Sequence, residues 1–255
     1  MLIFLLLYSC GGSSNTQTTI GDNSDTQTTT KSVDTILIPL YSYPVGQYSQ
    51  EWQKLYNFNT NKKVFVIVNV DSGPSEQPDS NYVDAISRLK TKGFYVVGYV
   101  RTLYANRDIN LVKTHIDRWL QFYPNMIDGF FIDEVANQPD KYNYYADIYN
   151  YVKSKSQNMY VVLNPGTIID ASYWNISDKI VVFESPYGEF KNYNHSFNSQ
   201  ISSNVCIIVY GVPNITSFYE VRSKGFSINS SCQYITDYSD PDTVYFYLSN
   251  YLSLF

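Results

Sequence analysis

Short runs of β-branched and aromatic residues alternate with longer amphipathic or polar stretches from about Thr35 onward. Strands that alternate with helices form a parallel sheet, because each helix carries the chain back across the sheet. Eight such runs in about 220 residues predict an α/β fold with a single closed (β/α)8 TIM-type barrel. An open doubly wound sheet is the alternative, but it normally has a nucleotide-binding motif at its switch point, and the sequence has none. The predicted strands are Ile36–Leu40, Val64–Val68, Tyr95–Tyr99, Gly129–Ile132, Tyr160–Leu163, Ile180–Phe183, Val205–Tyr210 and Gly225–Ile228.

Two of the intervening stretches have the spacing of amphipathic helices. In Asn81–Thr91 and in Ile109–Phe122, apolar residues recur at intervals of three and four, which places them on one helix face. We therefore predict a helix over each range, with the apolar face against the barrel. Residues 35–255 together are expected to form one domain, this barrel.

One predicted strand ends abruptly in two adjacent carboxylates, Asp133 and Glu134. Ionised groups just past a buried strand are unfavourable unless they are paired or open to solvent, and barrel enzymes place their acid and base groups there. Glu184 ends a second β-rich run, and the Pro186 that follows does not allow a regular strand to continue. These three carboxylates are the candidate catalytic residues. The structural alternative is that Asp133 caps the next helix and Glu134 lies in its first turn.

Polar and aromatic residues also follow most of the other predicted strands. In a barrel these positions meet at one face, where barrel enzymes have their sites. Tyrosine is unusually frequent, with 26 in 255 residues, and its apolar ring with a hydroxyl edge suits the faces and rims of sugars. A compositional bias towards surface tyrosine is the alternative explanation. The candidate substrate-binding residues are Tyr41, Asn69, Tyr99, Arg101, Tyr104, Asn164, Tyr210 and Asp237.

The composition argues against several other classes of function. A net charge of −5 without a basic cluster argues against nucleic acid as a partner. The two histidines, His115 and His195, do not form a zinc-binding pair, and there is neither a serine-hydrolase elbow nor a phosphate-binding loop. We therefore expect no metal and no cofactor. Cys206 and Cys232 could form a disulfide or remain two separate buried thiols.

The N-terminus predicts export. Leu2 to Leu7 are apolar, and the Cys10 that follows resembles the lipidated cysteine of bacterial lipoproteins; an ordinary cleaved signal peptide is the alternative. Residues 1–10 are therefore predicted to be a lipoprotein-type signal segment. Residues 11–34 are Ser, Thr, Asn, Gln, Asp and Gly with little apolar content, which predicts a disordered polar linker. We expect attachment to the outer membrane or cell surface through the N-terminal lipid only.

Six motifs, in order along the chain, resemble those of the spherulin-4-like family. They are Pro39-Leu-Tyr-Ser-Tyr-Pro44, Val68-Asn-Val-Asp-Ser-Gly-Pro74, Gly98-Tyr-Val-Arg-Thr-Leu-Tyr104, Asp128-Gly-Phe-Phe-Ile-Asp-Glu134, Leu163-Asn-Pro-Gly166 and Phe183-Glu184. The resemblance implies a (β/α)8 glycoside hydrolase related to endo-acting galactosaminidases, which cut galactosamine-containing exopolysaccharide. Its carboxylate trio falls on Asp133, Glu134 and Glu184. One departure is Val70, where the family pattern has a proline after the asparagine.

Glycosidic cleavage needs one carboxylic acid to protonate the leaving oxygen and one carboxylate that attacks, stabilises or activates water. A neighbouring carboxylate raises a pKa, so we expect the acid in the adjacent pair, Glu134 ahead of Asp133, with Glu184 as nucleophile or base. All three carboxyl groups should face one cleft. We expect Glu184 and the nearer of Asp133 and Glu134 to be separated by roughly 5–5.5 Å, the short spacing of a retaining enzyme. Substrate assistance, with Asp133 orienting a 2-acetamido group, is a rival mechanism. The rival function is that of a non-catalytic surface protein that binds polysaccharide through the same cleft. We expect the protein to be a monomer.

Overall fold

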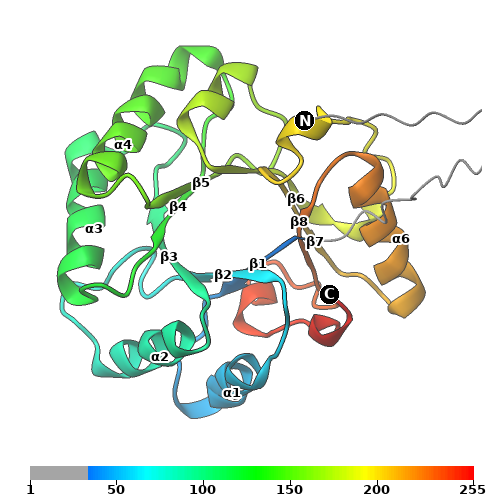
Figure 1. Ribbon diagram of the computed structural model, residues 1–255, viewed down its shortest axis with the longest axis horizontal. Helices are drawn as coiled ribbons and strands as arrows, with labels where there is room; N and C mark the ends of the chain where they lie inside the picture. The colour runs from blue at the N-terminus through cyan, green and yellow to red at the C-terminus, as the bar shows by residue number, and fades with distance from the viewer. Residues whose placement is uncertain (1–33) are drawn as a thin grey trace, which may run out of the picture. The chain divides into compact units, whose positions relative to one another are not determined.

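Eight parallel strands form one closed barrel in residues 34–255, the part of the chain that the computed structural model describes (Figure 1). Each strand pairs with the next one in chain order, and β1 pairs with β8 to close the ring. The predicted (β/α)8 barrel is therefore confirmed. The strands are β1 (Thr35–Leu40), β2 (Lys63–Val68), β3 (Tyr95–Arg101), β4 (Gly129–Asp133), β5 (Tyr160–Asn164), β6 (Lys179–Pro186), β7 (Val205–Tyr210) and β8 (Cys232–Ile235).

Helices surround the ring of strands (Figure 1). The predicted helix over Ile109–Phe122 matches the structure at both ends, and the one over Asn81–Thr91 begins one residue earlier, at Ser80. The α-helices are α1 (Ser49–Asn57), α2 (Ser80–Thr91), α3 (Ile109–Phe122), α4 (Tyr142–Lys155), α5 (Tyr187–Phe190) and α6 (Ile215–Ser227). Short 3-10 helices are η1 (Gly46–Tyr48), η2 (Pro139–Lys141), η3 (Ala171–Ile176), η4 (Ser199–Ile201), η5 (Val244–Phe246) and η6 (Leu252–Leu254). No helix in residues 34–255 is both long and apolar enough to cross a membrane.

The contact between α3 and β3 shows how a helix fixes a strand of the barrel. A Cβ on Gly98 would lie 2.7 Å from the ring of Trp119, so glycine is what allows the indole to pack directly on β3. The Trp119 indole nitrogen donates to the carbonyl of Tyr99 at 2.9 Å. This buried hydrogen bond holds the backbone of Tyr99, whose side chain lies in the candidate site described below.

The eighth strand was predicted at the wrong place. Gly225–Ile228 is not a strand, because α6 continues to Ser227 and the amide of Ile228 still donates to the carbonyl of Lys224 at 3.1 Å. The strand is instead Cys232–Ile235. A Cβ on Gly225 would come within 2.3 Å of the Gln233 side chain, so this glycine marks close packing of α6 on β8 rather than a strand.

The sixth strand is longer than the sequence suggested. Pairing with β7 continues past Phe183 to Pro186, which lies opposite Tyr210. The register shifts between Val181 and Phe183, and a proline at the last residue of a strand removes only one donor. Glu184 therefore lies within β6 rather than after it.

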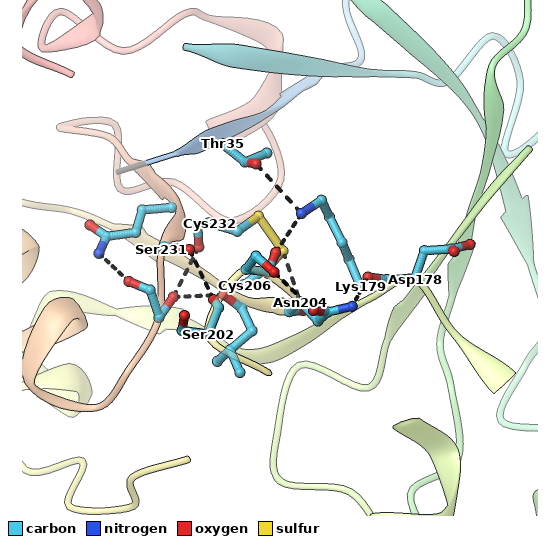
Figure 2. Close-up of a disulfide and its surroundings, with 12 residues drawn as sticks. Thr35, Asp178, Lys179, Ser202, Asn204, Cys206, Ser231 and Cys232 are labelled. Carbon is cyan, nitrogen blue, oxygen red and sulfur yellow. Dashed lines mark hydrogen bonds between the residues drawn. A yellow bond between two sulfur atoms is a disulfide. The ribbon is translucent and has the colours of Figure 1, made fainter. Parts of the chain in front are cut away.

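Cys206 and Cys232 form a disulfide between β7 and β8 (Figure 2). The two residues are direct partners in the strand register, with Cα atoms 4.4 Å apart. The bond decides between the two alternatives left open by the sequence. Near it, the amine of the buried Lys179 donates to the carbonyl of Ser203 at 2.6 Å.

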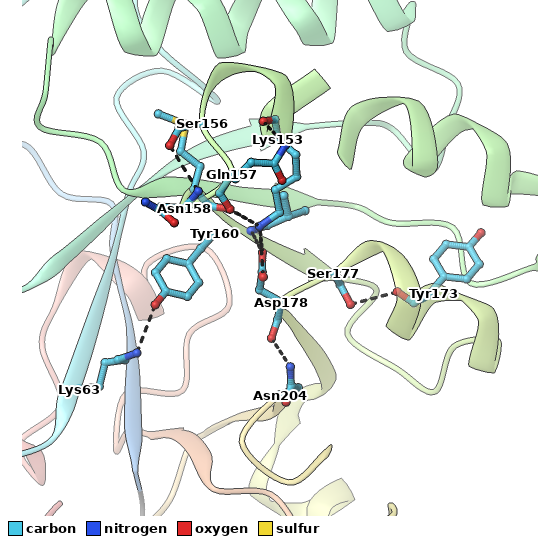
Figure 3. A network of polar contacts seen from close by, with 12 residues as sticks. Lys63, Lys153, Ser156, Gln157, Asn158, Tyr160, Tyr173, Ser177, Asp178 and Asn204 are labelled. Atoms are coloured by element: carbon cyan, nitrogen blue, oxygen red, sulfur yellow. Dashed lines mark hydrogen bonds and ion pairs between the residues drawn. The ribbon is translucent and has the colours of Figure 1, made fainter. Parts of the chain in front are cut away.

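Asp178, the residue directly before β6, is at the centre of a polar network (Figure 3). It pairs with the amine of Lys153 at 2.9 Å and accepts from the amide of Val161 at 2.7 Å, while its carbonyl accepts from Asn204. Asp128 has the same arrangement with Lys90 and the amide of Val96. These two carboxylates therefore link strands to helices, which is a structural role. The predictions made for residues 1–33, including Cys10, lie outside the described residues.

Candidate active site

Asp133 and Glu184 lie side by side at the carboxyl ends of the strands. Both accept hydrogen bonds from the side-chain nitrogen Nδ2 of Asn164, Asp133 Oδ1 at 2.7 Å and Glu184 Oε2 at 2.6 Å. Together these two distances limit the separation of the two acceptor oxygens to about 5.3 Å. Strands β4, β5 and β6 are neighbours, so the middle strand supplies the donor that lies between the two carboxylates.

The Asn164-Pro-Gly turn fixes the orientation of this amide. Asn164 Oδ1 accepts from the amide of Gly166 at 3.1 Å, which leaves Nδ2 to face the carboxylates. The Gly166 carbonyl in turn accepts from the amide of Glu184 at 3.1 Å. Gly166 has a φ of +64°, a conformation that favours glycine. The Asn164-Pro-Gly turn thus joins the end of β5 to the backbone of Glu184.

Two tyrosine hydroxyls bind the outer oxygens of the same pair. Tyr99 donates to Asp133 Oδ2 at 2.5 Å, from the adjacent strand β3. Tyr245 donates to Glu184 Oε1, from the segment that follows β8. Each oxygen of the two carboxylates therefore accepts at least one hydrogen bond. Charge-assisted hydrogen bonds of this kind hold a carboxylate more firmly than neutral ones do.

Burial and proximity raise the proton affinity of both groups. Burial, followed by the charge of Asp133, raises the pKa of Glu184 from 4.5 to about 7, although the hydrogen bonds from Tyr245 and Asn164 act in the opposite direction. Burial also raises the pKa of Asp133, against the effect of its hydrogen bonds. Two carboxylates this close do not both ionise easily, so the pair keeps a proton to higher pH than an isolated carboxyl group does.

Glu134 points to a different partner from its neighbour. Its backbone has a φ of 53°, in the left-handed region, and Oε1 accepts from Arg101 Nε at 2.8 Å. Its other oxygen, Oε2, is buried without a hydrogen-bond partner among the described residues. The hydroxyl of Thr102 lies 2.7 Å from the carbonyl of Asp133 and 2.8 Å from that of Glu134, which secures this bend. Arg101, a candidate substrate-binding residue, is thus the ion-pair partner of Glu134.

The candidate tyrosines differ in their relation to the carboxylates. The ring of Tyr41 lies between those of Tyr99 and Tyr245, with centroid distances of 5.7 Å and 5.3 Å and edge-to-face geometry. Burial, then the charges of the two carboxylates, raises its pKa well above 10. Tyr210 is near enough to Glu184 for that charge to raise its pKa, after burial. Tyr104 is 58% exposed, and its amide donates to the carbonyl of Glu134 at 2.8 Å.

Two of the predicted substrate-binding residues, Asn69 and Asp237, have structural contacts. Asn69 Oδ1 accepts from the amide of Gly73 at 3.0 Å and so stabilises the turn after β2. Asp237 accepts from the amide and side chain of Asn250 at 3.0 and 2.7 Å, which fastens the C-terminal segment.

Sequence reasoning missed Tyr245. It lies in a stretch without strand or helix periodicity, and its contact with Glu184 spans 61 residues along the chain. The available signal was the aromatic cluster Tyr245-Phe-Tyr247 beyond the last strand, where barrel loops contribute to sites. Among the described residues no group of three or more His, Cys, Asp or Glu side chains is arranged to hold a metal ion.

The chain was compared with known proteins. Residues 35–255 match the model of spherulation-specific family 4. Spherulin-4 of Physarum polycephalum is 38% identical over 159 residues, which cover 62% of this chain and 46% of that protein, so the chain spans about half the length of this curated relative.

Two solved structures have similar folds. The crystal structure of Aspergillus clavatus Sph3 in complex with GalNAc matches with a TM-score of 0.74 and 25% identity, covering 88% of this chain and 96% of that one. Cyclic α-maltosyl-(1→6)-maltose hydrolase of Arthrobacter globiformis, in complex with maltose, matches with a TM-score of 0.50 and 9% identity over 87% and 79% of the two chains, which concerns the fold alone. With the family match extending over the whole barrel, the chain belongs to spherulation-specific family 4.

Proposed function

We propose that this protein is a glycoside hydrolase that cleaves a polysaccharide containing N-acetylgalactosamine or galactosamine. The observation that carries the proposal is the pair Asp133 and Glu184, which share the amide of Asn164 and have raised pKa values. Family membership and the similarity to Sph3, whose structure contains GalNAc, support the choice of sugar. Pure binding does not require two carboxylates that compete for one proton.

Glu184 fits the role of the acid that protonates the leaving oxygen. A carboxyl group with a pKa of about 7 is still partly protonated at neutral pH, so it can give its proton to the leaving oxygen. Once deprotonated, the same group can act as the base in the next step. Asp133 is held as the partner carboxylate by Tyr99 and Asn164. This assignment differs from the roles expected from the sequence, in which the acid was Glu134 ahead of Asp133 and Glu184 was the nucleophile or base.

The short separation of the two carboxylates favours retention of anomeric configuration. Retaining glycosidases have carboxyl groups about 5–5.5 Å apart, whereas inverting enzymes leave room for a water between them. Two routes lead to retention here. Asp133 attacks the anomeric carbon itself, or it orients a 2-acetamido group of the substrate that attacks instead. Proton NMR of the first product formed reports the anomer, and loss of activity on deacetylated polymer distinguishes the second route from the first.

Glu134 has a supporting role in this proposal. Its ion pair with Arg101 keeps Oε1 in place. Oε2 has no hydrogen-bond partner among residues 34–255 and is suited to accept from a sugar hydroxyl or amide. Tyr41 and Tyr210 are proposed to contact the sugar, since both lie close enough to feel the charge of Glu184.

A panel of polysaccharides tests the proposed function. The full chain is incubated with N-acetylgalactosamine-rich polymer, with its deacetylated form and with a neutral glucan, and new reducing ends are measured. The expected result is cleavage of one or both amino-sugar polymers and none of the glucan. Binding of the polymer without any cleavage would instead identify the protein as a non-catalytic polysaccharide-binding protein.

We also propose that the protein is exported and held at a membrane surface by a lipid on Cys10. The Cys206–Cys232 disulfide supports an oxidising compartment, since such bonds are rare in the cytosol. Cys10→Ser should move the protein from the membrane fraction to the soluble fraction, whereas an unchanged distribution would rule out lipid attachment at this residue.

A further inference from the structure

The segment after β8 has an unusual place in this barrel. In the described residues β8 is followed by no α-helix, although strands β1 to β4 and β7 are each followed by one of nine residues or more. Residues 236–255 contain only the short helices η5 and η6. This C-terminal segment lies beside β1 in the view down the barrel (Figure 1), and the carbonyl of Tyr245 accepts from the amide of Tyr41 at 2.7 Å. The segment therefore covers the junction where β8 meets β1.

Specific hydrogen bonds hold the C-terminal segment in place at two points on the barrel and at one point within the segment. The amide of Leu248 donates to the buried carboxylate of Glu51 at 2.9 Å, which joins the segment to α1. The hydroxyl of Tyr251 donates to the carbonyl of Val212 at 2.9 Å, which joins it to the loop after β7. Asp237 binds Asn250 across the segment itself. The position of Tyr245 is thus set by contacts that the residues after it make with α1 and with the loop after β7.

Tyr245 completes the set of hydrogen bonds around Glu184. The inner oxygen of that carboxylate accepts from Asn164, and the outer oxygen accepts from the hydroxyl of Tyr245. Its ring packs edge-to-face on Tyr41, so the hydroxyl has little freedom to leave. A carboxylate bound at both oxygens keeps a fixed plane, whereas one bound at a single oxygen can rotate about its last bond.

We propose that Tyr245 is a positioning residue, through which the C-terminal segment holds the carboxyl group of Glu184 in the plane that faces Asp133. This inference rests on the proposed function, in which Glu184 gives a proton to the leaving oxygen. Removing the hydroxyl frees one oxygen of Glu184 and lets the group turn away from the bond to be cleaved. The loss then falls on the chemical step rather than on substrate binding.

The same hydrogen bond affects how tightly Glu184 holds its proton. A donor stabilises the ionised carboxylate, so its removal raises the pKa of Glu184 above its present value of about 7. The other groups that face Glu184 are Asp133 on β4, Asn164 on β5, Tyr210 on β7 and Tyr41 on β1, none of which a change at Tyr245 removes. The shift should therefore be upward.

Tyr245→Phe in the full chain tests this inference, with Tyr251→Phe as the matched control. Both variants lose one tyrosine hydroxyl of the same segment, but only the first hydroxyl touches Glu184. For Tyr245→Phe we expect kcat to fall about 10- to 100-fold with KM changed less than about threefold. The upper limb of the pH profile should move to higher pH. Tyr251→Phe should lower the unfolding temperature and leave the pH profile in place.

A second measurement does not depend on catalysis. The carboxyl carbons of glutamate are labelled with ¹³C, the signal of Glu184 is assigned from its absence in Glu184→Gln, and its titration is followed by NMR. The titration midpoint should rise by half a pH unit or more in Tyr245→Phe and stay unchanged in Tyr251→Phe. If no polysaccharide is cleaved, this titration still tests the contact. Equal effects of the two variants on kcat and on the midpoint, or no effect of either, would overturn the positioning role.

Discussion

Asp133 and Glu184 accept hydrogen bonds from one and the same nitrogen, the side-chain amide of Asn164, at 2.7 and 2.6 Å. The two carboxylates come from β4 and β6, and the donor comes from the strand between them. This arrangement brings two like charges close together while giving each a partner. The pair therefore favours the state with one proton, which acid and base chemistry at a glycosidic bond requires.

The pH dependence of hydrolysis follows from the pKa of Glu184. The proposed acid must carry its proton, and burial with the charge of Asp133 raises its pKa to about 7. The value of kcat/KM should therefore fall as the pH rises through about 7, approaching a tenfold loss per pH unit. Initial rates between pH 4 and pH 9 measure this limb. A rate that keeps rising to pH 9 would exclude Glu184 as the acid.

The same pKa predicts an effect on stability. The folded protein holds the proton of Glu184 more tightly than the unfolded chain does, so ionisation destabilises the fold as the pH rises from 4.5 through about 7. Glu184→Gln removes that penalty. Its free energy of unfolding should exceed that of the original protein by about 1–3 kcal/mol at pH 8, after allowance for solvent screening, with little difference at pH 4.

Urea unfolding at both pH values measures this difference. The exposed Glu189 on α5 provides a matched control, because Glu189→Gln removes the same charge from a solvated position. That control should change stability by less than about 0.5 kcal/mol at either pH. A Glu184→Gln variant that is less stable than the original at pH 8 would contradict the unfavourable burial of this charge.

Asn164→Asp tests the shared amide. The substitution keeps the size of the side chain but places a third carboxyl group between Asp133 and Glu184, where the donor was. We expect kcat to fall at least about 100-fold and stability at pH 8 to decrease, because like charges repel at this distance.

Asn69→Asp is the control for that substitution. The acceptor oxygen of Asn69 binds the amide of Gly73, and an aspartate keeps that acceptor. Activity should stay within about twofold of the original. A large loss in this variant would show that Asn69 contacts the substrate, as the sequence suggested, and not only the turn.

The disulfide should contribute to stability and not to chemistry. Cys206 and Cys232 lie 26 residues apart in sequence, and cross-linking such a loop restricts the unfolded chain, which is worth about 2–4 kcal/mol. The double variant Cys206→Ala, Cys232→Ala should lose about this amount in urea unfolding and keep its kcat at 25 °C. A reductant should lower the stability of the original protein and leave the double variant unaffected.

Much of the barrel could be predicted from local patterns. Apolar runs followed by polar residues located the ends of β1, β2 and β7 at Leu40, Val68 and Tyr210, because buried parallel strands are apolar throughout and change character where they meet solvent. The error at β8 has a physical origin. Gly225 to Ile228 has the composition of a short strand, yet it ends a helix that packs closely on Gln233, a contact that the linear sequence does not show.

The residues of the candidate site could be proposed from the sequence, but the contacts between them could not. Asp133, Glu134 and Glu184 could be found because carboxylates at strand ends are conspicuous. The direction of Glu134 depends on a left-handed backbone at that residue, which no pattern in the sequence indicates. The contact of Tyr245 with Glu184 depends on how the chain returns after the last strand, a long-range relation that requires the folded structure.

Hydrolysis by three variants tests the central claim most directly. Release of reducing ends from N-acetylgalactosamine-rich polysaccharide is measured for the original protein, Asp133→Asn, Glu184→Gln and the control Glu189→Gln, with circular dichroism to verify folding. We expect cleavage by the original protein and by Glu189→Gln, and a loss of about 1,000-fold or more in the other two variants with unchanged spectra. Turnover near that of the original protein in both Asp133→Asn and Glu184→Gln would contradict the central claim.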